Sequence, residues 1–386
     1  MYAPPRPDER IAIPADAIAS REGRYEIALS EPMEEMTALD AATLTVVDLP
    51  PGWQMALDER MGINDPQPTG EPIYWRQSVE PSRTSVRHGE CEPRDATRAC
   101  ARADGIAIDP GPIDARFIGR TESPFAVVLE FPQPLNAFPG DPVLLMDGWI
   151  EYPYCQTNFA MWQAKAPLSP PTFEALDPRS GEWKTIVREY GYPAGMPREA
   201  AFPLPRESIP EDCRSLRITT NHELYFDRLR VVFATPCPEA IVRTIPAASA
   251  RVLASGFARR TTQAQRRPHY DYSDRLPLWD CKTQRGWYTA LAAECRELVA
   301  ERDDAVAIFG GGEEVRLTFD AIAQPPSDGW SRAFVLDLEG WCKDMDLLTG
   351  DGETVEPLPR RDATQPDSAP RDTLHRRFNT RYEGGR

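Results

Sequence analysis

The chain has 386 residues, 41% of them hydrophobic and 27% charged, a balance typical of a globular protein with two or three domains. Its formal charge of −16 argues against a nucleic-acid partner, whose phosphates must be neutralised, and against anionic membrane surfaces. No run approaches the roughly 18 apolar residues that a membrane helix needs, so we expect no membrane insertion.

Prolines number 40 and are scattered between apolar runs, which predicts short strands joined by Pro-rich loops. Residues 1–20 are predicted to be an extended N-terminal segment without the apolar core of a signal peptide. Residues 21–120 are β-rich and either form their own domain or contribute strands to the next one. Cys91 and Cys100 flank an Arg-rich loop and either close a disulfide or stay free thiols.

Residues 121–240 are predicted to form a β-sandwich. Residues 126–131 and 142–154 favour strands, and Thr172–Leu176 and Trp183–Glu189 favour a hairpin closed by the turn 177–181. The run 216–233 alternates apolar and polar residues on either side of a predicted turn at Asn221-His222. Charged residues of this run, such as Glu223 and Asp227, are expected outside the core or at a bend.

Residues 241–350 are predicted to form a second β-sandwich, with strands at 314–320 and 332–346. The segment 286–300 is the one plausible helix. Residues 351–386 are polar, charged and Pro-bearing, which predicts a disordered tail without a packed core. The fold class is therefore mostly β, with antiparallel sandwich modules of jelly-roll or galactose-binding-like type and one short helix.

Aromatic residues gather between 149 and 162. On an exposed sheet face such rings stack on sugars, whereas buried rings are core. A second group lies in the segment 266–274, where histidine and carboxylates either bind a metal or transfer a proton, or belong to an ordered surface loop. The candidate ligand-binding residues are Trp149, Tyr152, Tyr154, Trp162, His269, Tyr270 and Asp271.

Two carboxylates at positions i and i+2, Asp344 and Asp346, point the same way in a strand. They are candidate Ca²⁺ ligands, or they form ion pairs with the Arg-rich loop 259–267. Glu223 and Asp227 form a further carboxylate pair of the kind that glycoside hydrolysis needs, but no partner supports that role. Because no nucleophile, phosphate-loop or zinc-protease motif occurs, we assign no catalytic residue and no cofactor beyond a possible Ca²⁺ ion.

Several blocks resemble the C-terminal region of bacterial FG-GAP/VCBS-repeat proteins with an ASPIC/UnbV domain, the group that includes relatives of cartilage acidic protein. The resemblance implies an exported, multi-domain protein, periplasmic or extracellular, with an adjacent β-propeller of Ca-binding repeats. This chain contains no such propeller, and no D-x-D-x-D-G loop occurs in it. The blocks are 147–164, 188–199, 219–232, 256–272, 276–280, 284–290 and 340–359.

The sequence favours a non-enzymatic, extracytoplasmic binding or interaction region that recognises a glycan or a protein. One alternative is an enzyme or accessory protein acting on carbohydrate or a secondary metabolite. Another is a structural cap that protects the edge of an adjacent propeller. The absence of catalytic motifs, the acidic charge and the family resemblance motivate the first hypothesis.

Overall fold

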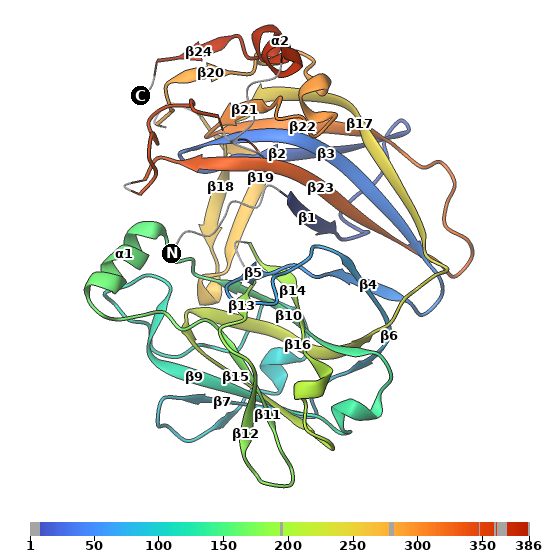
Figure 1. Cartoon of the computed structure of the whole chain (residues 1–386), viewed down its shortest axis with the longest axis vertical. Helices are drawn as coiled ribbons and strands as arrows, with labels where there is room; N and C mark the ends of the chain where they lie inside the picture. The colour runs from blue at the N-terminus through green and yellow to red at the C-terminus, as the bar shows by residue number, and fades with distance from the viewer. Residues whose placement is uncertain are drawn as a thin grey trace. The chain divides into compact units, whose positions relative to one another are not determined.

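The computed structural model describes residues 8–193, 196–277, 282–346, 348–358, 360 and 369–384. These residues are mostly β and form antiparallel sheets, which confirms the predicted fold class (Figure 1). The chain divides into two compact units. Unit 1 comprises residues 1–51, 239–260 and 270–386, and unit 2 comprises residues 52–238 and 261–269.

Unit 2 is a sandwich of two sheets (Figure 1). The five-stranded sheet has the order β14 (Arg198–Pro203), β10 (Asp141–Ile150), β16 (Leu224–Ala234), β6 (Pro72–Val79), β4 (Gln54–Leu57). The six-stranded sheet has the order β12 (Trp183–Val187), β11 (Thr172–Leu176), β15 (Ser215–His222), β9 (Arg120–Glu130), β7 (Arg83–His88), β8 (Arg94–Asp95). Two short strands, β5 (Met61–Gly62) and β13 (Gly191–Tyr192), form a separate pair.

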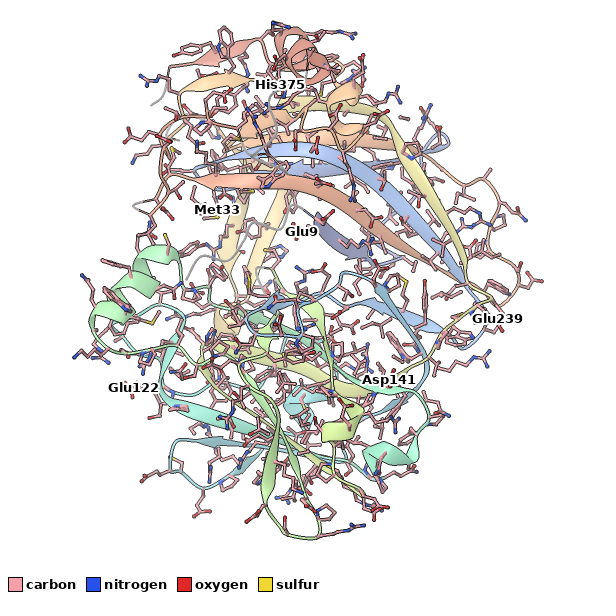
Figure 2. All side chains as sticks on the ribbon, in the orientation of Figure 1. Glu9, Met33, Glu122, Asp141, Glu239 and His375 are labelled. Carbon is pink, nitrogen blue, oxygen red and sulfur yellow. The ribbon has the colours of Figure 1, made fainter. Side chains whose placement is uncertain are left out.

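The core of unit 2 follows from strand alternation, because successive side chains of a strand point to opposite faces. Leu144 and Met146 of β10 and Val127 and Leu129 of β9 belong to one buried cluster that both sheets share. Side chains fill the interior between the sheets (Figure 2). The intervening residues of each strand therefore form the outer faces of the sandwich.

Unit 1 is built on long strands that pair in the order β1-β23-β3-β17-β22-β2, with β21 also on β3. Their bounds are β1 Asp8–Ile13, β2 Arg24–Ser30, β3 Glu35–Leu49, β17 Ile241–Ala254, β21 Ala307–Gly310, β22 Glu313–Asp320 and β23 Ser331–Asp344. β17 pairs with β3 through residues 241–246 and with β22 through residues 247–254. This change of partner turns the corner between two layers around a common core.

The remaining elements of unit 1 are short. The strands β20 (Gly286–Tyr288) and β24 (Arg381–Glu383) pair with each other. The strands β18 (Phe257–Thr262) and β19 (Pro268–Leu276) form a hairpin whose tip, residues 261–269, belongs to unit 2.

The observed units differ from the predicted domain boundaries. The boundary expected at 240 lies close to the observed change at residue 238, but residues 21–51 join the C-terminal part of the chain rather than residues 52–120. The reason is long-range pairing, since β2 pairs with β22 and β3 pairs with β17 and β23. Such pairing carries no local sequence signal.

The helix predicted at 286–300 was wrong. Its first residues form β20 and Arg296–Val299 form a 3₁₀ turn (η5), while Ala292 has a φ of 58°, which interrupts any helix. Among the described residues the α-helices are α1 (Cys155–Gln163) and α2 (Ala369–Phe378), and no helix of that part of the chain is long and apolar enough to span a membrane.

Two smaller expectations are also corrected. The tail beyond residue 350 is not disordered throughout, because α2 places Phe378 in the core of unit 1. Asn221 and His222 do not form a turn: both lie buried at the end of β15, and Glu223 alone separates β15 from β16. Cys91 and Cys100 are free thiols, and Cys100 is buried beside the Thr84 hydroxyl.

Candidate functional site

The outer face of the six-stranded sheet carries two rows of side chains that run across its strands. The strand register places Thr185, Glu174 and Arg217 side by side on β12, β11 and β15. The next row contains Thr172 of β11, Thr219 of β15 and, beyond Ala126 of β9, Arg87 of β7. Since these residues alternate with buried core residues, all of them face outward.

These rows line an open groove of about 590 Å³, within the range of ligand sites. Further lining comes from the strand ends. The described lining residues are Arg87, Gly89, Pro124, Phe125, Ala126, Ser169, Thr172, Glu174, Thr185, Arg188, Arg217, Thr219 and Thr220. The lining therefore combines hydroxyl and guanidinium groups with apolar side chains.

Positively charged side chains outnumber negatively charged ones in the groove. Arg217 Nε donates a hydrogen bond of 2.6 Å to Glu174 Oε2, and its guanidinium lies 4.5 Å from the centre of the Trp183 ring. Arg87 and Arg188 are exposed, and neither makes an ion pair with a described residue. The groove of a strongly acidic chain thus carries three arginines against one glutamate.

Some hydroxyl groups of the groove form hydrogen bonds within the protein, and others form none with the described residues. The Thr220 hydroxyl donates to the backbone oxygen of Ser169, and the Thr172 hydroxyl accepts from the backbone N–H of Glu189. The hydroxyls of Thr185 and Thr219 have no hydrogen-bond partner among the described residues. They are free to bind a ligand that lies across the strands.

Trp149, predicted to bind a ligand, is buried and cannot stack on one. Its ring is 1% exposed and stacks on Tyr225 at 5.5 Å. Its Nε1–H donates to the backbone oxygen of Gln265, and Gln265 in turn makes two hydrogen bonds with the backbone of Ala107. The hairpin tip therefore covers Trp149, which is a core residue of unit 2.

The other predicted aromatic residues lie around α1. Tyr152 packs half-buried against the core, in edge contact with Tyr154. Tyr154, Phe159 and Trp162 are exposed, and Trp162, at 73%, stacks on Phe159. Helix α1 contains no charged residue. This aromatic surface (Tyr154, Phe159 and Trp162) is the exposed remainder of the predicted cluster.

His269, Tyr270 and Asp271 lie on β19, in the hairpin with β18. His269 and Asp271 are exposed, and the Tyr270 ring stacks on Tyr272 at 6.3 Å. The Asp271 carboxylate accepts hydrogen bonds from the N–H and hydroxyl of Ser273. The segment is thus a strand rather than the surface loop that the sequence offered as an alternative, and the binding role of these residues stays a prediction.

The tip of the same hairpin forms a buried polar contact inside unit 2. Arg266 Nε lies 3.2 Å from Oε1 of Glu223, which also accepts the Tyr225 hydroxyl at 2.9 Å. Glu223 is fully buried, and burial raises its pKa. Gln265 and Arg266 both have positive φ, at 54° and 53°. Glu223, expected outside the core or at a bend, lies buried between β15 and β16 and anchors a strained turn.

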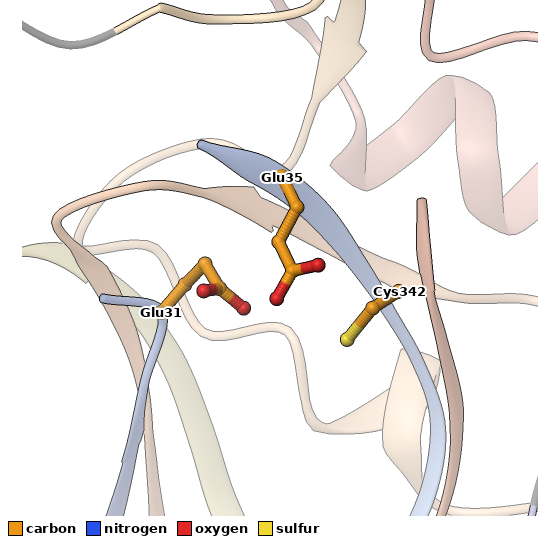
Figure 3. Close-up of side chains that lie close together, drawn as sticks. All are labelled: Glu31, Glu35 and Cys342. Carbon is orange, nitrogen blue, oxygen red and sulfur yellow. The ribbon is translucent and has the colours of Figure 1, made fainter. Parts of the chain in front are cut away.

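In unit 1, Glu31, Glu35 and Cys342 converge: their oxygen and sulfur ligand atoms lie within 4.8 Å of one another (Figure 3). Glu31 is buried and accepts the N–H of Met33 and the hydroxyl of Thr37, both at 2.8 Å. Burial and the neighbouring carboxyl groups raise the pKa of Glu35 to about 9. Carboxylates with a thiolate suit Zn²⁺ better than Ca²⁺, which prefers oxygen alone.

The predicted metal ligands Asp344 and Asp346 are not part of this three-residue group. Asp344 lies opposite Glu35 in the β23–β3 ladder and shares a hydrogen bond with it. Asp346 accepts the backbone N–H groups of Leu348 and Thr349, as a turn residue does. A Ca²⁺ site at these two residues stays a prediction.

Comparisons with protein-family models, with curated proteins and with solved structures gave no match to this chain. The resemblance to the ASPIC/UnbV-type proteins therefore stays a prediction, together with the location that it implies.

The groove was missed as a site, although the sequence predicts its elements. The hairpin of β11 and β12 was expected and is confirmed. Its outward residues, Thr172, Glu174 and Thr185, have the polar alternation of any solvated strand. The available signal is the register that sets them beside Arg217, Thr219 and Arg87, and that register depends on long-range pairing.

Proposed function

We propose that unit 2 is a non-catalytic carbohydrate-binding module that holds an extended glycan across the outer face of its six-stranded sheet. The observation that carries the proposal is the groove itself. Its rows of threonines lie beside guanidinium groups, and both can hydrogen-bond to sugar hydroxyls.

The shape of the groove favours a chain ligand. It is open and runs across adjacent strands. A buried small molecule would need an enclosed, mostly apolar pocket with a few polar groups. The half-buried Trp183, with Arg217 over its ring, extends the face by a flat surface on which a sugar can pack.

The composition of the groove favours binding over hydrolysis. Glycoside hydrolysis requires two carboxyl groups on either side of the scissile bond. The described lining holds one, Glu174, and its carboxylate is paired with Arg217. Binding without cleavage is therefore the activity that this face supports best.

A glycan-binding screen of the whole chain tests the proposal, with Thr219→Phe as the blocking variant. Phenylalanine suits a strand and would fill the middle of the second row, so we expect it to abolish binding while the melting temperature stays near wild type. Ser78→Phe, at an exposed position on β6 of the other sheet, is the matched control and should bind as wild type does.

Two results would contradict the proposal. One is the absence of binding to every glycan by a chain whose melting curve is intact. The other is binding that survives Thr219→Phe and is lost in Trp162→Ala, which would move the site to the aromatic surface on α1.

A further inference from the structure

The charges of the groove indicate the chemical class of its ligand, an inference that rests on the proposed function. Arg83, on the same strand as Arg87, lies 3.4 Å from Glu130, and Arg179, in the turn after β11, pairs with Glu211. Arg87 and Arg188 face the groove and have no such carboxylate among the described residues. The guanidinium groups of Arg87 and Arg188 are therefore available to pair with an anionic ligand.

Arg217 has a different role. Its charge is matched by Glu174 at 2.6 Å, and its plane lies on Trp183. It therefore supplies hydrogen bonds and a flat surface without adding net charge. The net positive charge of the lining resides in Arg87 and Arg188.

These two arginines enter the groove from different sides. Arg87 belongs to β7, whereas Arg188 follows directly after β12, and β11, β15 and β9 lie between those strands. Adjacent strands are about 4.8 Å apart, so β7 and β12 are separated by about 19 Å of sheet. The threonines, which carry no charge, occupy the space between the two sides.

We propose that the ligand is an acidic polysaccharide whose uronate carboxylates pair with Arg87 and Arg188. A polymer with an acid on successive sugars can pair with the arginines on both sides of the groove. The planar guanidinium fork matches a carboxylate with two parallel hydrogen bonds. The sugar hydroxyls between the acids then meet Thr185 and Thr219.

The test measures binding of the whole chain to immobilised polygalacturonate, with neutral dextran, dextran sulfate and poly-glutamate as comparison polymers. We expect polygalacturonate to bind most tightly. Arg87→Ala combined with Arg188→Ala should weaken that binding about tenfold, since exposed ion pairs contribute a few-fold each. Arg83→Ala, which removes an equal charge from the same strand outside the groove, should leave it unchanged.

Ionic strength adds a second readout. Raising salt from about 0.02 M to about 0.5 M should weaken wild-type binding and change the double variant much less, because salt screens exposed charges. Equal salt responses in the two proteins would contradict the assignment of the two arginines.

The outcomes separate this inference from the proposed function. If dextran binds as tightly as polygalacturonate and the double variant binds normally, the ligand is neutral and only the acidic assignment fails. If dextran sulfate or poly-glutamate binds as tightly, the uronate assignment fails. If no polysaccharide binds, both proposals fail.

Discussion

The two outer faces of unit 2 belong to one sandwich and share one core, yet they differ in how fully their arginines are paired. On the five-stranded sheet, Arg230 is buried and lies against Glu199 and Asp147. On the six-stranded sheet, Arg87 and Arg188 are exposed and lack an ion-pair partner among the described residues.

The difference separates stability from binding. A buried ion pair contributes to stability, because removing one of its members leaves the other charge buried without a partner and without water. Charges that lie in a groove without partners are available to a ligand. Substitutions on the first face should therefore change stability, and substitutions on the second face should change ligand affinity.

The largest expected effect is on the five-stranded sheet, which contains Trp149. Trp149→Ala removes a ring that is buried against Tyr225, together with its hydrogen bond to Gln265. Urea denaturation should show a loss of about 3–5 kcal/mol, typical of a buried tryptophan replaced by alanine. A loss below about 1 kcal/mol would contradict the role of Trp149 as a core residue.

Arg230→Ala and Arg188→Ala compare one arginine from each face. Removing Arg230 leaves Glu199 and Asp147 without their cation, so we expect a loss of about 2–4 kcal/mol of unfolding free energy. Removing Arg188 should change stability by less than about 0.5 kcal/mol and lower glycan affinity instead. A large loss of stability in Arg188→Ala and none in Arg230→Ala would contradict these assignments.

The pH dependence of stability gives a third test, at Glu199 on the five-stranded sheet. Burial raises the pKa of Glu199 from 4.5 to about 7, despite the opposing effect of Arg230. The folded state therefore holds the proton more tightly than the unfolded state. The contribution of Glu199 to the free energy of unfolding is complete below pH 4.5 and is lost as the pH rises through about 7.

Glu199→Gln should remove that part of the pH dependence. Melting temperatures measured from pH 4.5 to pH 8 should fall less steeply in the variant than in the wild type. Glu182→Gln, an exposed position in the turn before β12, should keep the wild-type slope. Identical slopes in all three proteins would show that Glu199 titrates normally.

The smallest expected effect concerns the aromatic surface on α1. Trp162 is 73% exposed and contacts Phe159, so Trp162→Ala should change the unfolding free energy by less than about 0.5 kcal/mol. Polygalacturonate binding should not change. A clear loss of binding in this variant would assign the glycan to α1 instead of the groove.

Local pattern was enough to predict the strands of unit 2 but not their partners. The alternation of Phe173 and Ala175 with polar residues marked β11, and the turn after it marked the hairpin with β12. The same alternation cannot reveal that Thr219 lies beside Thr172, because 46 residues separate them and only folding brings them together.

The predicted site residues fail for a related reason. Trp149 and Trp162 belong to one aromatic run in the sequence, yet one ends in the core and the other on the surface. Burial of Trp149 depends on Gln265 and Tyr225, which are distant in sequence. The sequence shows the run of aromatic residues, but it does not show which of their rings are buried and which are exposed to solvent.

Hydroxyl-radical footprinting of the chain with bound oligogalacturonide tests the central claim most directly, because it follows Trp183 and Trp162 in one sample. Trp183 stands beside the groove, and Trp162 lies on the aromatic surface. We expect the ligand to slow oxidation of Trp183 and to leave the rate at Trp162 unchanged. Protection of Trp162 with an unchanged rate at Trp183 would contradict it.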